Sequence, residues 1–123
     1  MMTIKAKSLF SCLLFIPFLS ANADNVDPCE NIVGTWQGTY SNTTCKVEAV
    51  AQFNKYKSTI RMNLRLDDKS KYQCQINEVN FTSSGTCTDA MIMFLDGSNM
   101  KGTIFDNSIH LKNTYEIIDL KKK

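Results

Sequence analysis

The chain has 123 residues, with 14 Lys and Arg against 12 Asp and Glu and a formal net charge of +2. Two of these lysines, Lys5 and Lys7, lie in a segment that we expect to be removed, and the remaining 14 − 2 = 12 basic residues balance the 12 acidic ones. A neutral mature chain gives no electrostatic reason for nucleic-acid or membrane binding, and no nucleic-acid partner is expected.

The first 23 residues have the three parts of a secretory signal peptide. Lys5 and Lys7 precede an apolar run at residues 9–19, which is followed by Ala21-Asn22-Ala23. This order predicts cleavage between Ala23 and Asp24. The apolar run is shorter than the roughly 20 residues of a membrane-spanning helix. We therefore expect a secreted or periplasmic protein in which residues 24–123 form a single domain.

Four cysteines remain after the signal peptide, and they are Cys29, Cys45, Cys74 and Cys87. An even number of cysteines in a small exported chain predicts two disulfide bonds. The spacing contains no C-x-x-C pair and the chain has one histidine, so neither a zinc site nor any other metal or cofactor is expected.

The first predicted strand, residues 31–40, combines glycines with aromatic residues on one face. Its inward row reads Ile32, Gly34, Trp36, Gly38 and Tyr40. Glycine weakens a strand but allows it to coil strongly. We expect these glycines to leave space beside the aromatic rings for side chains from across a narrow barrel, or for a ligand.

Two further strands, at residues 44–54 and 59–66, alternate apolar and polar side chains and each predict one buried face. The alternation continues at residues 71–76, with Tyr72 on the apolar side, and changes phase at 77–79. A one-residue change of phase within a strand indicates a bulge.

The later strands are predicted at residues 89–95, 100–105 and 108–118. Residues 83–85 (Ser-Ser-Gly) have the composition of a turn, as do the other segments between strands. The three lysines at 121–123 are expected to be a frayed tail.

The pattern predicts seven strands, or eight if the change of phase divides one in two, joined in sequence order by short turns. This describes a small all-β protein, an antiparallel up-and-down barrel, because closure of the sheet removes its edges. The alternative is a β-sandwich.

An up-and-down strand order also predicts the disulfide pairing. Cys45 and Cys74 fall near one end of the strands, whereas Cys29 and Cys87 fall near the other. We therefore predict the disulfides Cys45–Cys74 and Cys29–Cys87.

Gly34-Thr35-Trp36 on the first strand, followed by an up-and-down meander, resembles the calycin group. This group includes lipocalins, fatty-acid-binding proteins, avidins and small bacterial metalloprotease inhibitors. The resemblance implies that Trp36 packs over the base of a barrel. Lipocalins usually place an Arg against this Trp from the last strand, but no Arg follows Arg65 here. Lys112 is the nearest substitute, and its alternation points it outward.

Chain length and the position of Cys45 make the chain more similar to the inhibitors than to lipocalins or avidins. The known inhibitors insert their mature N-terminus into a protease cleft. That segment would correspond here to residues 24–28, which do not match the residues of the family.

Catalytic chemistry finds little support in the sequence. His110 is the only histidine, and its alternation with Ile109 and Leu111 points it outward. Asp67 and Asp68 are adjacent in a polar turn, which is typical of solvated turn residues rather than of a catalytic pair. We expect no enzyme activity.

Residues 90–95 (AMIMFL) are apolar on both faces of the predicted strand. Either face would then leave apolar side chains outside the core. The partner-surface candidates are Met91, Met93, Leu95 and Phe105. The N-terminal segment or a loop would cover this patch, or it would bind a partner protein or a second copy of the chain as a homodimer.

A second surface feature is basic. The anionic-surface candidates are Lys46, Arg61, Arg65 and Lys71. This row would bind an anionic glycan, a lipid headgroup or a phosphate-bearing surface, or it is the solvated side of the sheet.

The leading functional hypothesis is an exported, non-enzymatic binding protein, such as an inhibitor or a secreted effector that contacts a host or envelope protein. The alternative is a carrier of a small hydrophobic ligand inside the barrel, lined by Trp36, Tyr40, Asn113 and Tyr115. Interior volume separates the two, because barrels of about eight strands are either filled by side chains or hold one small ligand.

Overall fold

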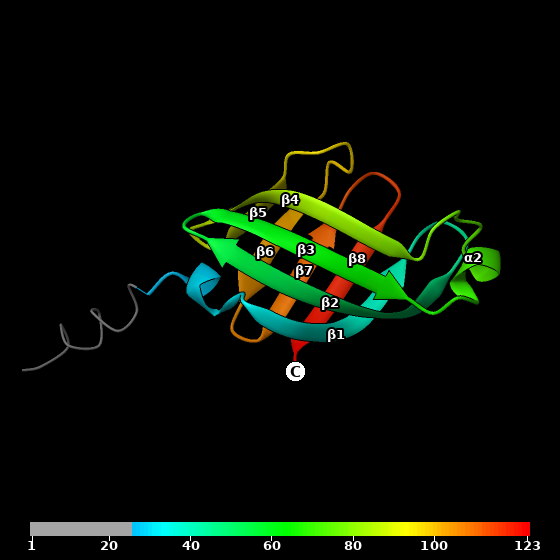
Figure 1. Cartoon of the computed structure of the whole chain (residues 1–123), viewed down its shortest axis with the longest axis horizontal. Coiled ribbons are helices and arrows are strands. Elements are labelled where there is room, and N and C mark those ends of the chain that lie inside the picture. The colour runs from blue at the N-terminus through cyan, green and yellow to red at the C-terminus, as the bar shows by residue number, and fades with distance from the viewer. Residues whose placement is uncertain (1–25) are drawn as a thin grey trace, which may run out of the picture.

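The computed structural model describes residues 26–123, and the predicted signal peptide at residues 1–23 lies outside this range. Eight antiparallel strands follow one another around a closed barrel, in which β8 pairs with β1 (Figure 1). The strands are β1 Gly34–Ser41, β2 Lys46–Tyr56, β3 Thr59–Leu66, β4 Asn80–Thr88, β5 Met91–Phe94, β6 Lys101–Phe105, β7 Ser108–Lys112 and β8 Ile117–Lys122. The predicted up-and-down barrel is confirmed, and the alternative of a sandwich is wrong.

Two short helical turns lie at opposite ends of the barrel (Figure 1). They are η2 Pro28–Asn31, just before β1, and α2 Ser70–Gln73, between β3 and β4. No helix within residues 26–123 combines the length and the apolar composition needed to cross a membrane.

The strict alternation of β2 and β3 is confirmed. Ile60, Met62 and Leu64 on β3 are buried, and Ala51 and Phe53 on β2 lie beside them in the core. Period-two burial in neighbouring strands gives the barrel one continuous apolar interior.

The strand predicted at residues 71–76 is wrong. Residues 67–69 instead form a turn that leads into α2, where the Cys74 N–H donates to the Ser70 carbonyl at 2.8 Å, and Tyr72 is exposed. The next strand, β4, runs through residues 83–85, which were predicted to be a turn. Its inward positions hold small residues, including Ser83 and Gly85, so the apolar alternation that marks a strand is absent there.

The prediction of one strand at residues 108–118 with a frayed tail after it is also wrong. The Asn113 Oδ1 accepts hydrogen bonds from the N–H groups of Tyr115 and Glu116, which turns the chain between β7 and β8. β8 then includes Lys121 and Lys122 and pairs with β1, so the last residues close the barrel.

Both predicted disulfides are confirmed. Cys29–Cys87 joins the η2 segment to β4 with a Cα–Cα distance of 5.7 Å, and Cys45–Cys74 joins the β1–β2 loop to α2 at 4.9 Å. Each bond therefore fixes one end of the barrel. Two disulfides indicate that the protein folds in an oxidising compartment.

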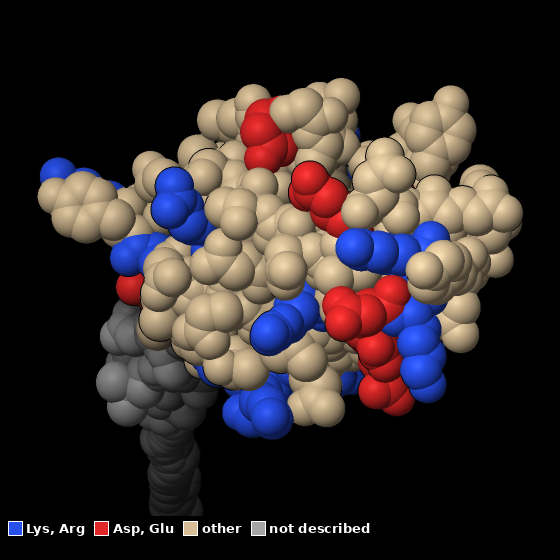
Figure 2. Space-filling model, turned by 45° about the vertical axis from the view of Figure 1, so that its right-hand side comes forward, with Lys and Arg blue, Asp and Glu red and all other residues tan. Residues whose placement is uncertain are grey.

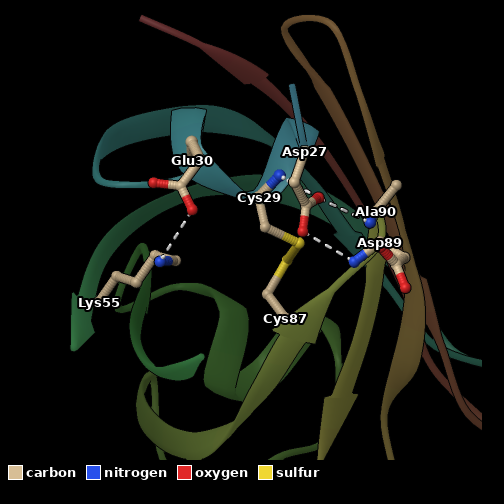
Figure 3. The surroundings of a disulfide bond; sticks show 7 residues. All are labelled: Asp27, Cys29, Glu30, Lys55, Cys87, Asp89 and Ala90. Atoms are coloured by element: carbon tan, nitrogen blue, oxygen red, sulfur yellow. Dashed lines mark hydrogen bonds and ion pairs between the residues drawn. A yellow bond between two sulfur atoms is a disulfide. The ribbon is translucent and has the colours of Figure 1, made fainter. Parts of the chain in front are cut away.

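Asp27 ties the chain before β1 to the turn between β4 and β5 (Figure 3). Its carboxylate accepts hydrogen bonds from the N–H groups of Cys29 at 3.0 Å, Asp89 at 2.8 Å and Ala90 at 3.0 Å. These bonds, that from Cys29 foremost, lower the pKa of Asp27 below its usual value.

The two glycines of β1 serve different contacts. At Gly34 a Cβ would lie 3.3 Å from Lys122 Cε, so the space is occupied by a side chain from the neighbouring strand β8 and not by one from across the barrel. At Gly38 a Cβ would lie 1.8 Å from the carbonyl oxygen of Asp119. The expected space beside Tyr40 is therefore absent at Gly38, because the backbone of β8 fills it.

Candidate functional site

The interior is closed by side chains at the η2 end. Trp36 is fully buried, and its Nε1–H donates to the Ile32 carbonyl at 2.8 Å. Phe53 meets the indole edge-on with 6.3 Å between ring centroids. The Lys122 ammonium lies 5.1 Å from the Trp36 ring centroid and donates to the Val33 carbonyl at 2.7 Å. Lys122, rather than Lys112, is thus the cation from the last strand that packs against this tryptophan.

The opposite end is closed by a stacked ring and a polar network. Tyr40 stacks on Phe81 with 6.1 Å between centroids, and its hydroxyl donates to Glu116 Oε2 at 2.6 Å. Asn113 Nδ2 donates to Glu116 Oε1 at 2.8 Å and to the Ser98 carbonyl at 2.8 Å. Burial first, and then the Glu116 carboxylate, raise the pKa of Tyr40.

The interior candidates therefore separate into three groups. Trp36 and Tyr40 lie in the core, Asn113 lies at the mouth of the barrel, and Tyr115 is 71% exposed in the β7–β8 turn. The cavity beside Tyr40 measures about 50 Å³, whereas small-molecule sites typically measure about 300–1,000 Å³. Glu116 was missed by the sequence reasoning, although its place three residues after the turn former Asn113 was a usable signal.

The four partner-surface candidates are exposed on or next to two neighbouring strands: Met91 and Met93 on β5, Leu95 directly after β5, and Phe105 on β6. We call these four side chains the methionine face. Met91, Met93, Leu95 and Phe105 are 52%, 45%, 71% and 73% exposed, respectively. The strand therefore turns Ile92 and Phe94 into the core, which decides between the two faces that the sequence left open.

The cross-strand neighbours of the two methionines are mostly uncharged. Met91 pairs with Thr88 and Thr103, and Met93 pairs with Thr86 and Lys101. The described chain does not cover the methionine face, as the exposed fractions show. A group of exposed large apolar side chains on neighbouring strands is typical of a contact site for another molecule.

The basic candidates lie on another part of the barrel, the outer face of β2 and β3. Lys46 and Arg65 line a surface groove of about 800 Å³, and Arg61 lies further along β3. Lys71 lies on α2 and does not line this groove, whereas Lys69, which the sequence reasoning missed, does. Figure 2 shows basic and acidic side chains interleaved near the α2 end.

Catalytic or metal chemistry has few groups to draw on. His110 Nδ1 contacts Asp119 Oδ1 across the outer face of β7 and β8, and about half of each side chain is exposed. Within residues 26–123, no hydroxyl or thiol bonds to His110, and no three His, Cys, Asp or Glu side chains gather as a metal site.

No protein-family model, curated protein or solved structure matches this chain. The likeness to calycins accordingly consists of the closed eight-strand barrel together with Gly34, Thr35 and Trp36.

Proposed function

We propose that this chain is an exported, non-enzymatic binding protein that uses the methionine face to contact another protein, as an inhibitor or secreted effector would. The signal-peptide pattern at residues 1–23 and the two disulfides support export to the cell exterior or periplasm. The target is a host or envelope protein that meets this chain in the same compartment.

The exposure of the methionine face is the observation that carries this proposal. Its four large apolar side chains, two on β5, one directly after β5 and one on β6, remain about half exposed or more, although the chain has a well-filled core. Met and Phe are enriched in the buried centres of protein interfaces, and charged residues are depleted there. Flexible methionine side chains also adapt to the shape of a partner.

The proposal includes a calycin-like origin for the barrel. Its support is the packing of Lys122 on Trp36, which supplies from the last strand the cation that the lipocalin pattern places there. The carrier alternative has weaker support, because a cavity of about 50 Å³ is too small for a hydrophobic ligand of ordinary size.

Site-specific photo-crosslinking tests this function. A photoreactive amino acid replaces Met93 in the mature chain or, as a control, replaces Ile117 on β8, where the native side chains are 45% and 41% exposed. Irradiation in fluid from the natural extracytoplasmic environment should give a discrete adduct with a second protein from position 93 and none from position 117.

Competition identifies the surface responsible. Excess unlabelled wild-type protein should abolish the adduct, whereas excess Met91→Lys/Leu95→Lys variant should not. Equal adducts from positions 93 and 117, no adduct at all, or an adduct between two copies of the chain would contradict a partner-protein function for the methionine face.

A further inference from the structure

The outer face of β2 and β3 carries three open surface grooves. The groove of about 800 Å³ near α2 shares Val50 and Arg65 with a second groove of about 390 Å³, which continues along the two strands. A third groove lies further on and includes Arg61. We call the two overlapping grooves, the third groove and their lining residues the β2–β3 trough.

The cations of the β2–β3 trough are available to a ligand. Within residues 26–123, no carboxylate lies within 4 Å of the charged ends of Lys46, Arg61, Arg65 or Lys69. Arg61 and Arg65 are separated by four residues on one face of β3, or about 13 Å at the usual rise of a strand. Glu48 and Asp67 also line the α2 end, so these four cations exceed the carboxylates of the lining by two. A fifth cation, Lys55, lines the third groove and pairs with Glu30 at 3.4 Å.

The remaining lining of the β2–β3 trough is rich in side-chain amides. The amide residues are Gln37, Gln52, Asn54, Asn63, Gln73 and Asn80. Amides both donate and accept hydrogen bonds, so they suit ligands with many hydroxyl groups. Two exposed large apolar side chains also line the trough, Val50 in the first two grooves and Tyr56 in the third.

Ser70 adds a second, independent observation. It lines the groove near α2 and is fully buried, yet its Oγ has no hydrogen-bond partner among the described residues. A buried hydroxyl without a partner is costly and calls for an explanation such as a ligand. Because this Oγ is buried in the free protein, an oxygen of a bound ligand would satisfy it once the neighbouring side chains at this end of the trough move aside.

We propose that the β2–β3 trough binds an oligosaccharide that carries carboxylate or sulfate groups. The cations bind the acidic groups, and the amides and Ser70 bind hydroxyl and ring oxygens. This inference goes beyond the proposed protein contact, because the trough involves neither β5 nor β6.

Other extended anions fit the β2–β3 trough less well. Single-stranded nucleic acid stacks its bases on aromatic rings, but the only aromatic residue that is largely exposed along the trough, within the described chain, is Tyr56 at its far end. An acidic peptide that binds by adding a strand needs an open sheet edge, whereas the sheet of this barrel is closed on itself.

Calorimetric titration of the mature protein with a heparin-derived octasaccharide tests the site. The Arg61→Gln/Arg65→Gln variant should bind about tenfold more weakly, since charge-assisted hydrogen bonds are lost. The matched control is Lys101→Gln/Lys112→Gln, which removes two cations from an exposed pair across β6 and β7 and should bind like the wild type. Equal losses in both variants would overturn the assignment to the trough.

Two further comparisons separate a built site from general attraction between charges. Ser70→Ala should weaken octasaccharide binding severalfold without lowering the thermal midpoint, because the hydroxyl has no partner in the free protein. Polyphosphate and polyglutamate of equal charge should bind at least about tenfold more weakly than the octasaccharide. Unchanged affinity in Ser70→Ala, or equal binding of all three polyanions, would refute an oligosaccharide site.

Discussion

Replacement of Gly38 by alanine tests the closure of the barrel between β1 and β8. The added Cβ would lie 1.8 Å from the Asp119 carbonyl oxygen and 2.9 Å from Leu120 Cα. Carbon and oxygen in contact are normally about 3.3 Å apart, so β8 must move by about 1.5 Å. Such a shift breaks about two backbone hydrogen bonds at about 1 kcal/mol each and adds strain of about 1–3 kcal/mol. We expect the free energy of unfolding to fall by about 3–5 kcal/mol.

Urea and thermal unfolding with both disulfides intact measure this loss. For a domain of this size, about 3 kcal/mol corresponds to a fall in Tm of about 12–24 °C. Gly97→Ala is the matched control, because a Cβ at Gly97 meets no atom within 4 Å, and we expect a change between zero and about 1 kcal/mol of stabilisation. If the two variants agree within about 0.5 kcal/mol, the close β1–β8 contact is refuted.

Three further predictions concern single contacts. Lys122→Met should lower the free energy of unfolding by about 1–3 kcal/mol and shift Trp36 fluorescence. The control, Lys121→Met, should change the free energy of unfolding by less than about 0.5 kcal/mol. Equal effects of the two variants in urea unfolding would count against the Trp36 contact. Folding lowers the pKa of Asp27 below 3.8, so as pH falls the unfolded chain takes up this proton first, and stability is lost as pH falls through the folded pKa. In thermal scans below about pH 4, Asp27→Asn should therefore lose less stability than the wild type. Parallel falls of Tm with pH in the two proteins would contradict this. Tyr40→Phe should remove an ionisation that occurs above the usual tyrosine pKa of 10 and lower the free energy of unfolding by about 1–2 kcal/mol. Alkaline absorbance titration of the wild type and the variant measures this ionisation. If the variant instead lacks a step near pH 10, the shifted pKa of Tyr40 is contradicted.

The barrel and its disulfides were predictable because their signals are local. Apolar alternation in β2 and β3 depends on the period of a strand, and the order of strands placed Cys45 beside Cys74. β4 was harder, because its inward residues are small for a tertiary reason. A Cβ at Gly85 would lie 2.0 Å from the Met93 carbonyl oxygen, and this contact is invisible in the sequence.

The candidate site residues also divide into those that local sequence patterns predicted and those that depend on tertiary contacts. Alternation on β5 predicted that one of two apolar faces is exposed, and the structure shows that this is the face of Met91 and Met93. In contrast, Lys69 and Ser70 reach the β2–β3 trough because the chain after β3 forms α2, which the Cys45–Cys74 bond holds near the β1–β2 loop. Lys122 was missed because a run of three terminal lysines resembles a tail, although it lies opposite Trp36 in the β1–β8 register.

Native mass spectrometry of the protein recovered from its own extracytoplasmic environment tests the central claim, that the barrel is filled and binds through its outer surface. The account predicts the mass of the polypeptide with two disulfides, free of small apolar ligands, and a complex with a second protein that Met91→Lys/Leu95→Lys abolishes. A bound hydrophobic molecule of a few hundred daltons, retained in that variant and in the absence of any second protein, would contradict the account and support an internal carrier site.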